Sequence, residues 1–357
     1  MVFVRKAFSV TMLALLLVSM LTLAFKVQPI ETSGTICAQA DGMIDPATAL
    51  AKQEAGILSE APPTEWSKTY GGTSSDVAQA LVQTTDGGYA LAGYTYSSGA
   101  GDDDFWLVKT DSAGNALWNM TYGGTSTDEA FGLVQTADGG YALAGVTLSF
   151  GFGAGHGDFW LVKTDASGNA QWNKTYGGTG RDGAYGGLVQ TADGGYALAG
   201  YTSSFGAGSF DAWLVKTDAS GNMQWNKAYG GTSWDIAYSL VQTADGGYAL
   251  AGVTYSFGAG WDDFWLVKTD ASGNAQWSKT YGGTGDDCAW ALMQASDGGY
   301  AIAGYTSSFG AGSYDFWLVK TDASGNAQWS KTYGGTGDDC AWALMQASDG
   351  GYAIAGY

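Results

Sequence analysis

One segment of about 52 residues recurs along most of this chain and limits what the chain can fold into. The tripeptide Tyr-Gly-Gly occurs once per copy, at intervals of 52 to 54 residues, starting at positions 70, 122, 176, 229, 281 and 333. Residues 285–305 return letter for letter at 337–357. A repeat of this length is one supersecondary unit that cannot bury its own faces, so the copies are expected to stack on one another.

Each copy predicts four antiparallel strands. In residues 128–176, the segments EAFGLVQT, YALAGVT, DFWLVKT and AQWNKTY are rich in β-branched and aromatic residues. Asp-Gly-Gly, a glycine-rich loop and Asp-Ala-Ser-Gly-Asn separate them, and such clusters form tight turns. Four strands in about 50 residues match one propeller blade, whereas a parallel β-helix uses shorter coils. We therefore predict an all-β fold, a β-propeller of four-stranded antiparallel blades.

The order of the segments predicts how many blades the chain holds. It contains a lone fourth strand at 66–72, five complete blades, and the first two strands of a sixth. The third strand of that sixth blade, DFWLVKT, does not follow, so we expect a propeller domain over 66–357 that is truncated at its C-terminus. The edge of the last strand, ending at Tyr357, would then be exposed.

Glycine and alanine in the second strand, YALAGY, predict a close approach of backbones near the central axis. One copy carries an additional glycine, in the pair Gly186-Gly187. We expect that residue to form a bulge or a longer link in its blade.

The N-terminus indicates export. Arg5 and Lys6 precede an uncharged run over 7–25, so residues 1–40 are predicted to be a signal peptide or an N-terminal membrane anchor. Residues 41–65 would form a linker with a short helix, ended by the two prolines at 62–63. The expected location is extracellular or at the cell surface, with membrane contact only through an uncleaved N-terminal segment.

Two tryptophan series recur with the repeat. The first precedes each Tyr-Gly-Gly and is predicted to pack between blades: Trp66, Trp118, Trp172, Trp225, Trp277 and Trp329. The second lies in the third strand: Trp106, Trp160, Trp213, Trp265 and Trp317. Because a recurring residue serves a recurring interface, we assign both series to the core rather than to ligand stacking.

The charge excludes one class of partner. The chain carries 15 basic and 34 acidic residues, a net charge of −19, which repels a phosphate backbone and argues against nucleic-acid binding. Cations, cationic proteins and neutral sugars stay compatible with it.

Cys288 and Cys340 occupy equivalent positions in successive copies. Since neighbouring sheets stand about 10 Å apart, we expect buried thiols rather than a disulfide.

Catalytic residue types are scarce, and no catalytic residue is predicted. His156 is the only histidine, so a Ser-His-Asp or zinc site lacks its usual members. Glu129 is the only glutamate within the repeats, and a symmetric ring of aspartates offers a glycosidase no pair of unlike carboxylates. Asp165, Ser167 and Asn169 resemble the start of a calcium loop, but Tyr176 stands where an EF-hand needs glutamate.

Differences between copies gather on one side of the predicted blade. The first and third turns share one face, and the second loop and the inter-blade link share the other, where variable and acidic residues collect. We take the aspartates on this second face as a candidate ligand or cation site, and the alternative is that they cap turns. They are Asp76, Asp128, Asp182, Asp235, Asp287 and Asp339 before the first strands, and Asp104, Asp158, Asp211, Asp263 and Asp315 before the third.

The repeat WxKTYGGTxxDxAxxLVQTxDGGYALAGYT, followed by DFWLVKTDASGN, resembles that of secreted archaeal and bacterial β-propeller proteins. These belong to the seven-bladed-propeller-like and kelch-like repeat group, and the resemblance covers 66–357. It implies the propeller fold and export but adds little about chemistry. The stretch from Asp165 to Trp172 also resembles the docking motif of quinoprotein propellers, one residue short, so no quinone site is carried over.

These features predict an exported, non-catalytic β-propeller that acts as a binding or cell-surface scaffold. Its expected partner is an extracellular protein or a glycan. The alternative is a polysaccharide-active enzyme that uses aspartate carboxylates. A quinone-dependent dehydrogenase fits the sequence much less well than either. No cofactor is predicted, and calcium is the one ion that the aspartate pattern leaves open.

Overall fold

The computed structural model describes residues 66–153 and 156–357. The predicted signal or anchor segment and the linker lie outside the described residues. Within the described ranges, none of the secondary structure is a helix of the length and apolarity needed to cross a membrane.

The described chain forms five four-stranded sheets and one two-stranded sheet, each antiparallel and in sequence order. We call the four-stranded sheets blades 1 to 5 and the two-stranded sheet blade 6. Blade 1 holds β1 (Asp76–Gln83), β2 (Tyr89–Thr95), β3 (Asp104–Thr110) and β4 (Ala116–Tyr122). Blade 2 holds β5 (Asp128–Gln135), β6 (Tyr141–Thr147), β7 (Asp158–Thr164) and β8 (Ala170–Tyr176). Blade 3 holds β9 (Asp182–Gln190), β10 (Tyr196–Thr202), β11 (Asp211–Thr217) and β12 (Met223–Tyr229).

The remaining sheets repeat the pattern. Blade 4 holds β13 (Asp235–Gln242), β14 (Tyr248–Thr254), β15 (Asp263–Thr269) and β16 (Ala275–Tyr281). Blade 5 holds β17 (Asp287–Gln294), β18 (Tyr300–Thr306), β19 (Asp315–Thr321) and β20 (Ala327–Tyr333). Blade 6 holds β21 (Ala341–Gln346) and β22 (Tyr352–Gly356). The predicted all-β propeller with repeats of about 52 residues is confirmed.

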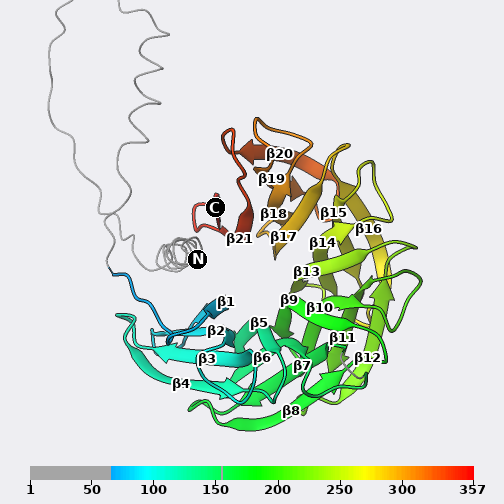
Figure 1. Cartoon of the computed structure of the whole chain (residues 1–357). Coiled ribbons are helices and arrows are strands. Elements are labelled where there is room, and N and C mark those ends of the chain that lie inside the picture. The colour runs from blue at the N-terminus through cyan, green and yellow to red at the C-terminus, as the bar shows by residue number, and fades with distance from the viewer. Residues whose placement is uncertain (1–65, 154–155) are drawn as a thin grey trace, which may run out of the picture.

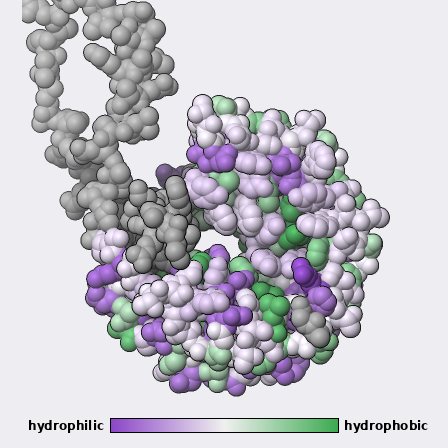
Figure 2. Space-filling view, in the orientation of Figure 1, coloured by the Kyte–Doolittle hydropathy of each residue, from purple (hydrophilic) through white to green (hydrophobic). Residues whose placement is uncertain are grey.

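The blades are arranged around a central opening, with the first strand of each blade innermost (Figure 1). The opening is also visible between the blades in the space-filling view (Figure 2). The first-strand positions bring β5 against β9, β9 against β13 and β13 against β17. Side chains at the same position in successive copies therefore become neighbours around the opening.

Every first strand contains a bulge, and the bulge explains the glycine of YALAGY. In blade 2, Ala130 pairs with Gly145 and Gly132 pairs with Ala144, which leaves Phe131 without a partner in the register. A Cβ added to Gly145 would lie 1.9 Å from the carbonyl oxygen of Glu129, so a side chain is excluded there. The close approach predicted for this glycine is thus made to the bulged first strand of its own sheet, and not to the central axis.

The additional glycine of blade 3 enlarges this bulge, as predicted. The register jumps from Gly187, paired with Ala199, to Gly183, paired with Tyr201. Gly186 lies inside the jump with φ +135°, a backbone conformation that other residues rarely adopt. One added residue is thereby absorbed locally, and β10 still pairs with β11 without a break.

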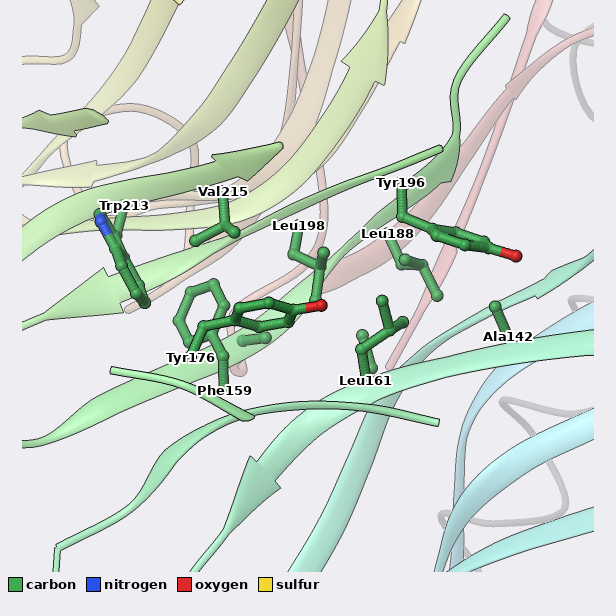
Figure 3. Close-up of a cluster of buried hydrophobic side chains, with 11 residues drawn as sticks. Ala142, Phe159, Leu161, Tyr176, Leu188, Tyr196, Leu198, Trp213 and Val215 are labelled. Atoms are coloured by element: carbon green, nitrogen blue, oxygen red, sulfur yellow. The ribbon is translucent and has the colours of Figure 1, made fainter. Parts of the chain in front are cut away.

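The hydrophobic core lies between the blades rather than within one of them. Second and third strands are buried on both faces, as in DFWLVKT of β7, which is buried at every position. Between blades 2 and 3, Phe159 packs against Trp213 with ring centroids 4.6 Å apart (Figure 3). The same cluster includes Ala142, Leu161, Tyr176, Leu188, Tyr196, Leu198 and Val215. Each blade therefore depends on its neighbours for burial.

The strand predicted at 66–72 is wrong, since this segment is not a strand and β1 begins at Asp76. Its side chains nevertheless occupy the places that fourth strands provide. Trp66 lies 5.9 Å from Tyr89, centroid to centroid, and the Tyr70 hydroxyl donates a hydrogen bond to the Gly114 carbonyl at 2.6 Å. The ladder is missing because no third strand lies beside the segment among the described sheets.

Both cysteines within the described repeats are free and buried, as expected. Burial raises the pKa of the Cys288 thiol well above its usual range, and Asp262 adds to the shift. An uncharged, buried thiol is a poor nucleophile, so this residue acts as a small apolar side chain.

We expect Trp213→Ala to destabilise the protein by about 3–5 kcal/mol, because this side chain is fully buried between two blades. Trp261 is 78% exposed, so Trp261→Ala is the matched control and should leave the unfolding midpoint unchanged. Urea denaturation followed by tryptophan fluorescence measures both. Equal midpoints for the two variants would contradict the inter-blade core.

Candidate ligand-binding site

The aspartates that begin the first strands cap the links between blades. Asp182 is completely buried. Its Oδ2 accepts hydrogen bonds from the Gly178 amide at 2.8 Å and from the Ser204 hydroxyl at 2.6 Å, while Thr202 donates to Oδ1. Equivalent bonds from the link amide recur at Asp76, Asp128, Asp235, Asp287 and Asp339. Each carboxylate therefore holds a link and the following loop together.

The aspartates that begin the third strands cap the long second loops in the same way. Asp211 Oδ2 accepts the amides of Ala207 and Gly208, both at 2.9 Å. Loop amides also donate to Asp104, Asp158, Asp263 and Asp315. All five side chains are buried, with at most 2% exposed.

The two aspartate series meet at every blade junction. A Cβ added to Gly177 would lie 1.7 Å from Asp158 Oδ1 of blade 2 and 2.9 Å from Asp182 Oδ2 of blade 3. The first glycine of each Tyr-Gly-Gly is required because it lies against both carboxylates. Burial, reinforced by the Asp182 charge, raises the pKa of Asp158 to about 6. Burial likewise raises the pKa of Asp104 and of Asp263.

The tryptophans of the first series lie between blades. Each packs against the first residue of the second strand in the following blade. Trp172 and Tyr196 have ring centroids 5.8 Å apart and nearly perpendicular planes. The same contact joins Trp118 to Tyr141, Trp225 to Tyr248, Trp277 to Tyr300, and Trp329 to Tyr352. In blades 1 to 4 these tryptophans are half-buried at the outer strands, while Trp329 of blade 5 is 38% exposed. The second series, Trp106, Trp160, Trp213, Trp265 and Trp317, is buried.

The face opposite the second loops is nearly identical from blade to blade. In each four-stranded blade a buried lysine from the third strand pairs with the aspartate of Asp-Gly-Gly, as Lys163 does with Asp138 at 2.9 Å. The bonds from Lys163 and Thr136 lower the pKa of Asp138 to about 2. Asp165 closes the third turn through the amides of Ser167 and Asn169. This face carries structural contacts that recur in the four-stranded blades, and a pocket lies on it between blades 5 and 6, lined by Asp297, Lys320 and Gly351 among others.

The second-loop face differs between blades, and blades 3 to 5 carry a chain of aromatic side chains there. Tyr201 contacts Phe210 with centroids 4.9 Å apart, and Phe210 contacts Trp234 at 5.3 Å. Trp234 in turn lies 6.2 Å from Tyr255. Trp234 is 50% exposed and Tyr255 is 43% exposed. This arrangement leaves aromatic surface open to solvent next to the blade 4 loop.

Two carboxyl groups lie at the end of this aromatic chain, at the junction of blades 4 and 5. Asp262, from the second loop of blade 4, forms a β-bridge with Asp286, from the following link. Burial, reinforced by the neighbouring Asp286, raises the pKa of Asp262 to about 7. Asp262 therefore takes up a proton near neutral pH.

Three tyrosines surround this carboxyl pair. Burial, then the Asp262 charge, raises the pKa of Tyr255 to about 12. Tyr314 lies beside Asp286 and contacts Tyr305, with centroids 4.8 Å apart. We call the following set the aromatic–acidic patch: Tyr201, Phe210, Trp234, Tyr255, Asp262, Asp286, Tyr305 and Tyr314.

Sequence reasoning did not find this patch. The aspartates taken as candidates are the repeated ones, and these are buried in loop caps. Asp262 and Asp286 each precede a repeated aspartate, at two positions where the residue varies between copies; the preceding junction has Phe210 and Trp234 there. The available signal was the departure from the repeat, at two positions that face each other across a junction.

The structure offers little for catalysis by other groups. His156 lies in the second loop of blade 2, where its amide donates to the Gly153 carbonyl at 3.4 Å. Burial, then Asp103, raises the pKa of the half-buried Glu129. In the described part of the chain, no three or more histidine, cysteine, aspartate or glutamate side chains form a group suited to a metal ion.

Comparison with known proteins identifies no family for this chain. No family model matches it. Regulatory protein FlaEY of Caulobacter vibrioides is 30% identical over 159 residues. The match covers 40% of this chain and 16% of FlaEY, so this chain corresponds to a small part of that protein.

Solved propeller structures resemble the chain at low sequence identity. The WD40 domain of Neurospora crassa Pan2 is 11% identical with a TM-score of 0.46, over 78% of this chain and 85% of that domain. Sqt1 from Chaetomium thermophilum is 12% identical with a TM-score of 0.41, over 76% of this chain and 75% of that one. The endo-1,5-alpha-L-arabinanase of Thermotoga petrophila RKU-1 is 11% identical with a TM-score of 0.34, over 78% and 73%. The fold assignment rests on the sheet topology, and function is not transferred.

Asp158→Asn should stabilise the protein above pH 7, by on the order of 1–2 kcal/mol, and do little at pH 4. The folded pKa of Asp158 lies above its unfolded value, so the wild type gains stability from this group at low pH and loses it as pH rises through about 6. Thermal unfolding between pH 4 and 8 measures the difference.

Asp182→Asn is the matched control across the same junction. Asp182 accepts bonds from one amide and two hydroxyls, and an amide nitrogen in its place would face those donors. This variant should be less stable than the wild type throughout the pH range. A stabilising effect of Asp182→Asn at pH 8 would contradict the assigned roles.

The repeated aspartates cap loops, so we expect no calcium-specific stabilisation. The melting temperature in millimolar calcium chloride should equal that in sodium chloride of the same ionic strength. Differential scanning calorimetry measures this. A rise specific to calcium would instead indicate a cation held between the paired carboxylates, by mass action.

Proposed function

We propose that this chain is an exported, non-catalytic β-propeller that binds a partner through its second-loop face. The aromatic–acidic patch is the observation that carries this proposal. It combines solvent-exposed aromatic surface with a pair of carboxyl groups, and it is built on a frame that repeats in every blade. Exposed aromatic side chains grouped beside convergent polar groups are typical of binding sites.

The contrast between the two faces favours binding over a purely structural role. Lysine–aspartate pairs and capped turns repeat on one face with nearly constant distances, 2.6 to 2.9 Å for the ion pairs. On the other face, the position before the third strand is Asp103, Gly157, Phe210, Asp262 or Tyr314. Loops that vary on a rigid scaffold are where recognition usually resides.

The geometry of the carboxyl pair favours a non-catalytic role over the alternative of a polysaccharide-active enzyme. Retaining glycosidases keep their two carboxyl groups about 5–5.5 Å apart, and inverting ones about 6.5–9.5 Å apart. Asp262 is 5% exposed and lies across a β-bridge from Asp286, so the inner carboxyl is not open to a sugar substrate.

The proposed partner is an extracellular protein or glycan, and the proposed location is outside the cell or at its surface. The uncharged N-terminal run after Arg5 and Lys6 motivates this part of the proposal. We propose that the chain is a member of the secreted archaeal and bacterial propellers of the kelch-like group, and the repeat resemblance supports this proposal.

Replacing Trp234 and Tyr255 with alanine should weaken partner binding at least about tenfold, since exposed aromatic anchors commonly dominate interfaces. The test measures binding of the purified chain to a panel of immobilised polysaccharides and basic, acidic and neutral peptides by biolayer interferometry. Leu117→Ala is the matched control, because Leu117 is 58% exposed but lies on the outer strand β4.

The control variant should bind as the wild type does. If the chain released reducing sugar from a polysaccharide, and Asp262→Asn or Asp286→Asn abolished that release, the protein would be an enzyme and the proposed non-catalytic function would be wrong. Equal loss in the Leu117 variant would show that the second-loop face is not the binding surface.

A further inference from the structure

We infer that the acidic end of the aromatic–acidic patch binds an organic cation, the ammonium or guanidinium group of a basic polypeptide, at Asp286 with Asp262 behind it. This inference rests on the proposed function and gives its partner a chemical class. The carboxyl pair, the tyrosines around it and the exposed aromatics beside it are the observations that carry it.

The first observation is an incomplete set of partners for a buried carboxyl group. Asp262 is 5% exposed, and its Oδ1 has no hydrogen-bond partner among the described residues. Asp286 is half-buried at the surface side of the pair, and its side chain is not used to cap a loop. A buried, unpartnered carboxyl oxygen is unfavourable, and a cation bound at Asp286 would relieve both charges.

The second observation is the aromatic surround. Tyr255 and Tyr314 flank the two carboxyls, Tyr305 packs behind Tyr314, and Trp234 extends the surface from Tyr255. The faces of aromatic rings attract cations, and such rings combined with carboxylates recognise ammonium and guanidinium groups. The net charge of −19 further attracts a basic partner over a distance.

An inorganic divalent ion fits this end of the patch less well. No group of three or more acidic, cysteine or histidine side chains among the described residues is suited to a metal ion, and the neighbouring Asp287 and Cys288 are buried in β17. Calcium takes six to eight oxygen ligands, whereas an ammonium group needs three acceptors and is satisfied by few groups. A neutral glycan would use the aromatic surface without needing the carboxyl pair.

Binding of a cation here should release a proton. The groups that face Asp262 are Asp286 from the link, Tyr255 and Tyr314 from the second loops of blades 4 and 5, Tyr305 from β18, and Asp287 and Cys288 from β17. Below pH 7 Asp262 holds a proton, which must leave to the buffer before the cation meets the full negative charge of both carboxylates. Affinity should therefore rise with pH, by about tenfold between pH 6 and 8.

The experiment is isothermal titration calorimetry of the full chain with hexalysine at low ionic strength, at pH 6 and pH 8. Lysine stays charged across this range, so a change in affinity reports on the protein. We expect Asp286→Asn to reduce affinity at pH 8 at least tenfold. We expect Asp262→Asn to abolish the pH dependence of binding and to raise the melting temperature at pH 8, because it removes a buried charge. Asp286→Asn should keep the wild-type melting temperature.

Asp102→Asn is the charge-matched control, since Asp102 is exposed on the second-loop face of blade 1, away from the patch. It should change affinity less than twofold. Equal loss in Asp102→Asn and Asp286→Asn would reduce the effect to general surface attraction and overturn the site. Acetylated, uncharged hexalysine or cellohexaose binding as tightly as hexalysine would also overturn it. If the biolayer panel shows binding that needs Trp234 and Tyr255 while hexalysine does not bind, the cation site fails and the proposed binding function stands.

Discussion

Burial of both faces of every sheet is the constraint on which this structure depends. The second and third strands are apolar on both sides, and each can be covered only by a neighbouring blade. Phe159, Tyr176 and Trp213 come from two blades and form one cluster. A single blade would expose these surfaces to water, so the same residues must recur wherever a blade meets the next. Copying the repeat is the simplest way to meet that requirement.

The paired aspartates connect this buried frame to the loops. Asp158 and Asp182 converge on Gly177 from neighbouring blades, and each also holds amides of its own loop. The frame therefore extends into the loops, where a phenylalanine also packs on the third-strand tryptophan in blades 2 to 5. Asp262 and Asp286 of the aromatic–acidic patch lie at positions where the residue varies between copies.

Much of the frame could be predicted from the sequence because it is repeated. Period, turn chemistry and apolar strands indicated the blades, and the additional glycine of blade 3 indicated its enlarged bulge. Residues 66–72 were assigned as a strand by similarity to other copies, but a strand needs a hydrogen-bonding neighbour that pattern alone does not supply. The patch could not be predicted, since the residues before the first and third strands vary between copies and the repeat does not show which of them meet at a junction. Asp262 and Asp286 become neighbours only through a bridge between a loop and a link.

The bulge of each first strand has a consequence for how such a protein can diversify. The residue left out of the register is Gln79, Phe131, Tyr238, Trp290 or Trp342 in five blades, and in blade 3 Tyr185 lies within the enlarged bulge. Where these residues are aromatic they stack on one another around the opening, as Tyr238 does on Trp290 with centroids 4.2 Å apart. No cross-strand partner restricts the residue at this position. Unequal exchange between the repeats of the gene could therefore replace one aromatic residue with another and leave the hydrogen bonds between the strands intact. The side chains that line the opening can thus change in one blade without a change in its neighbours.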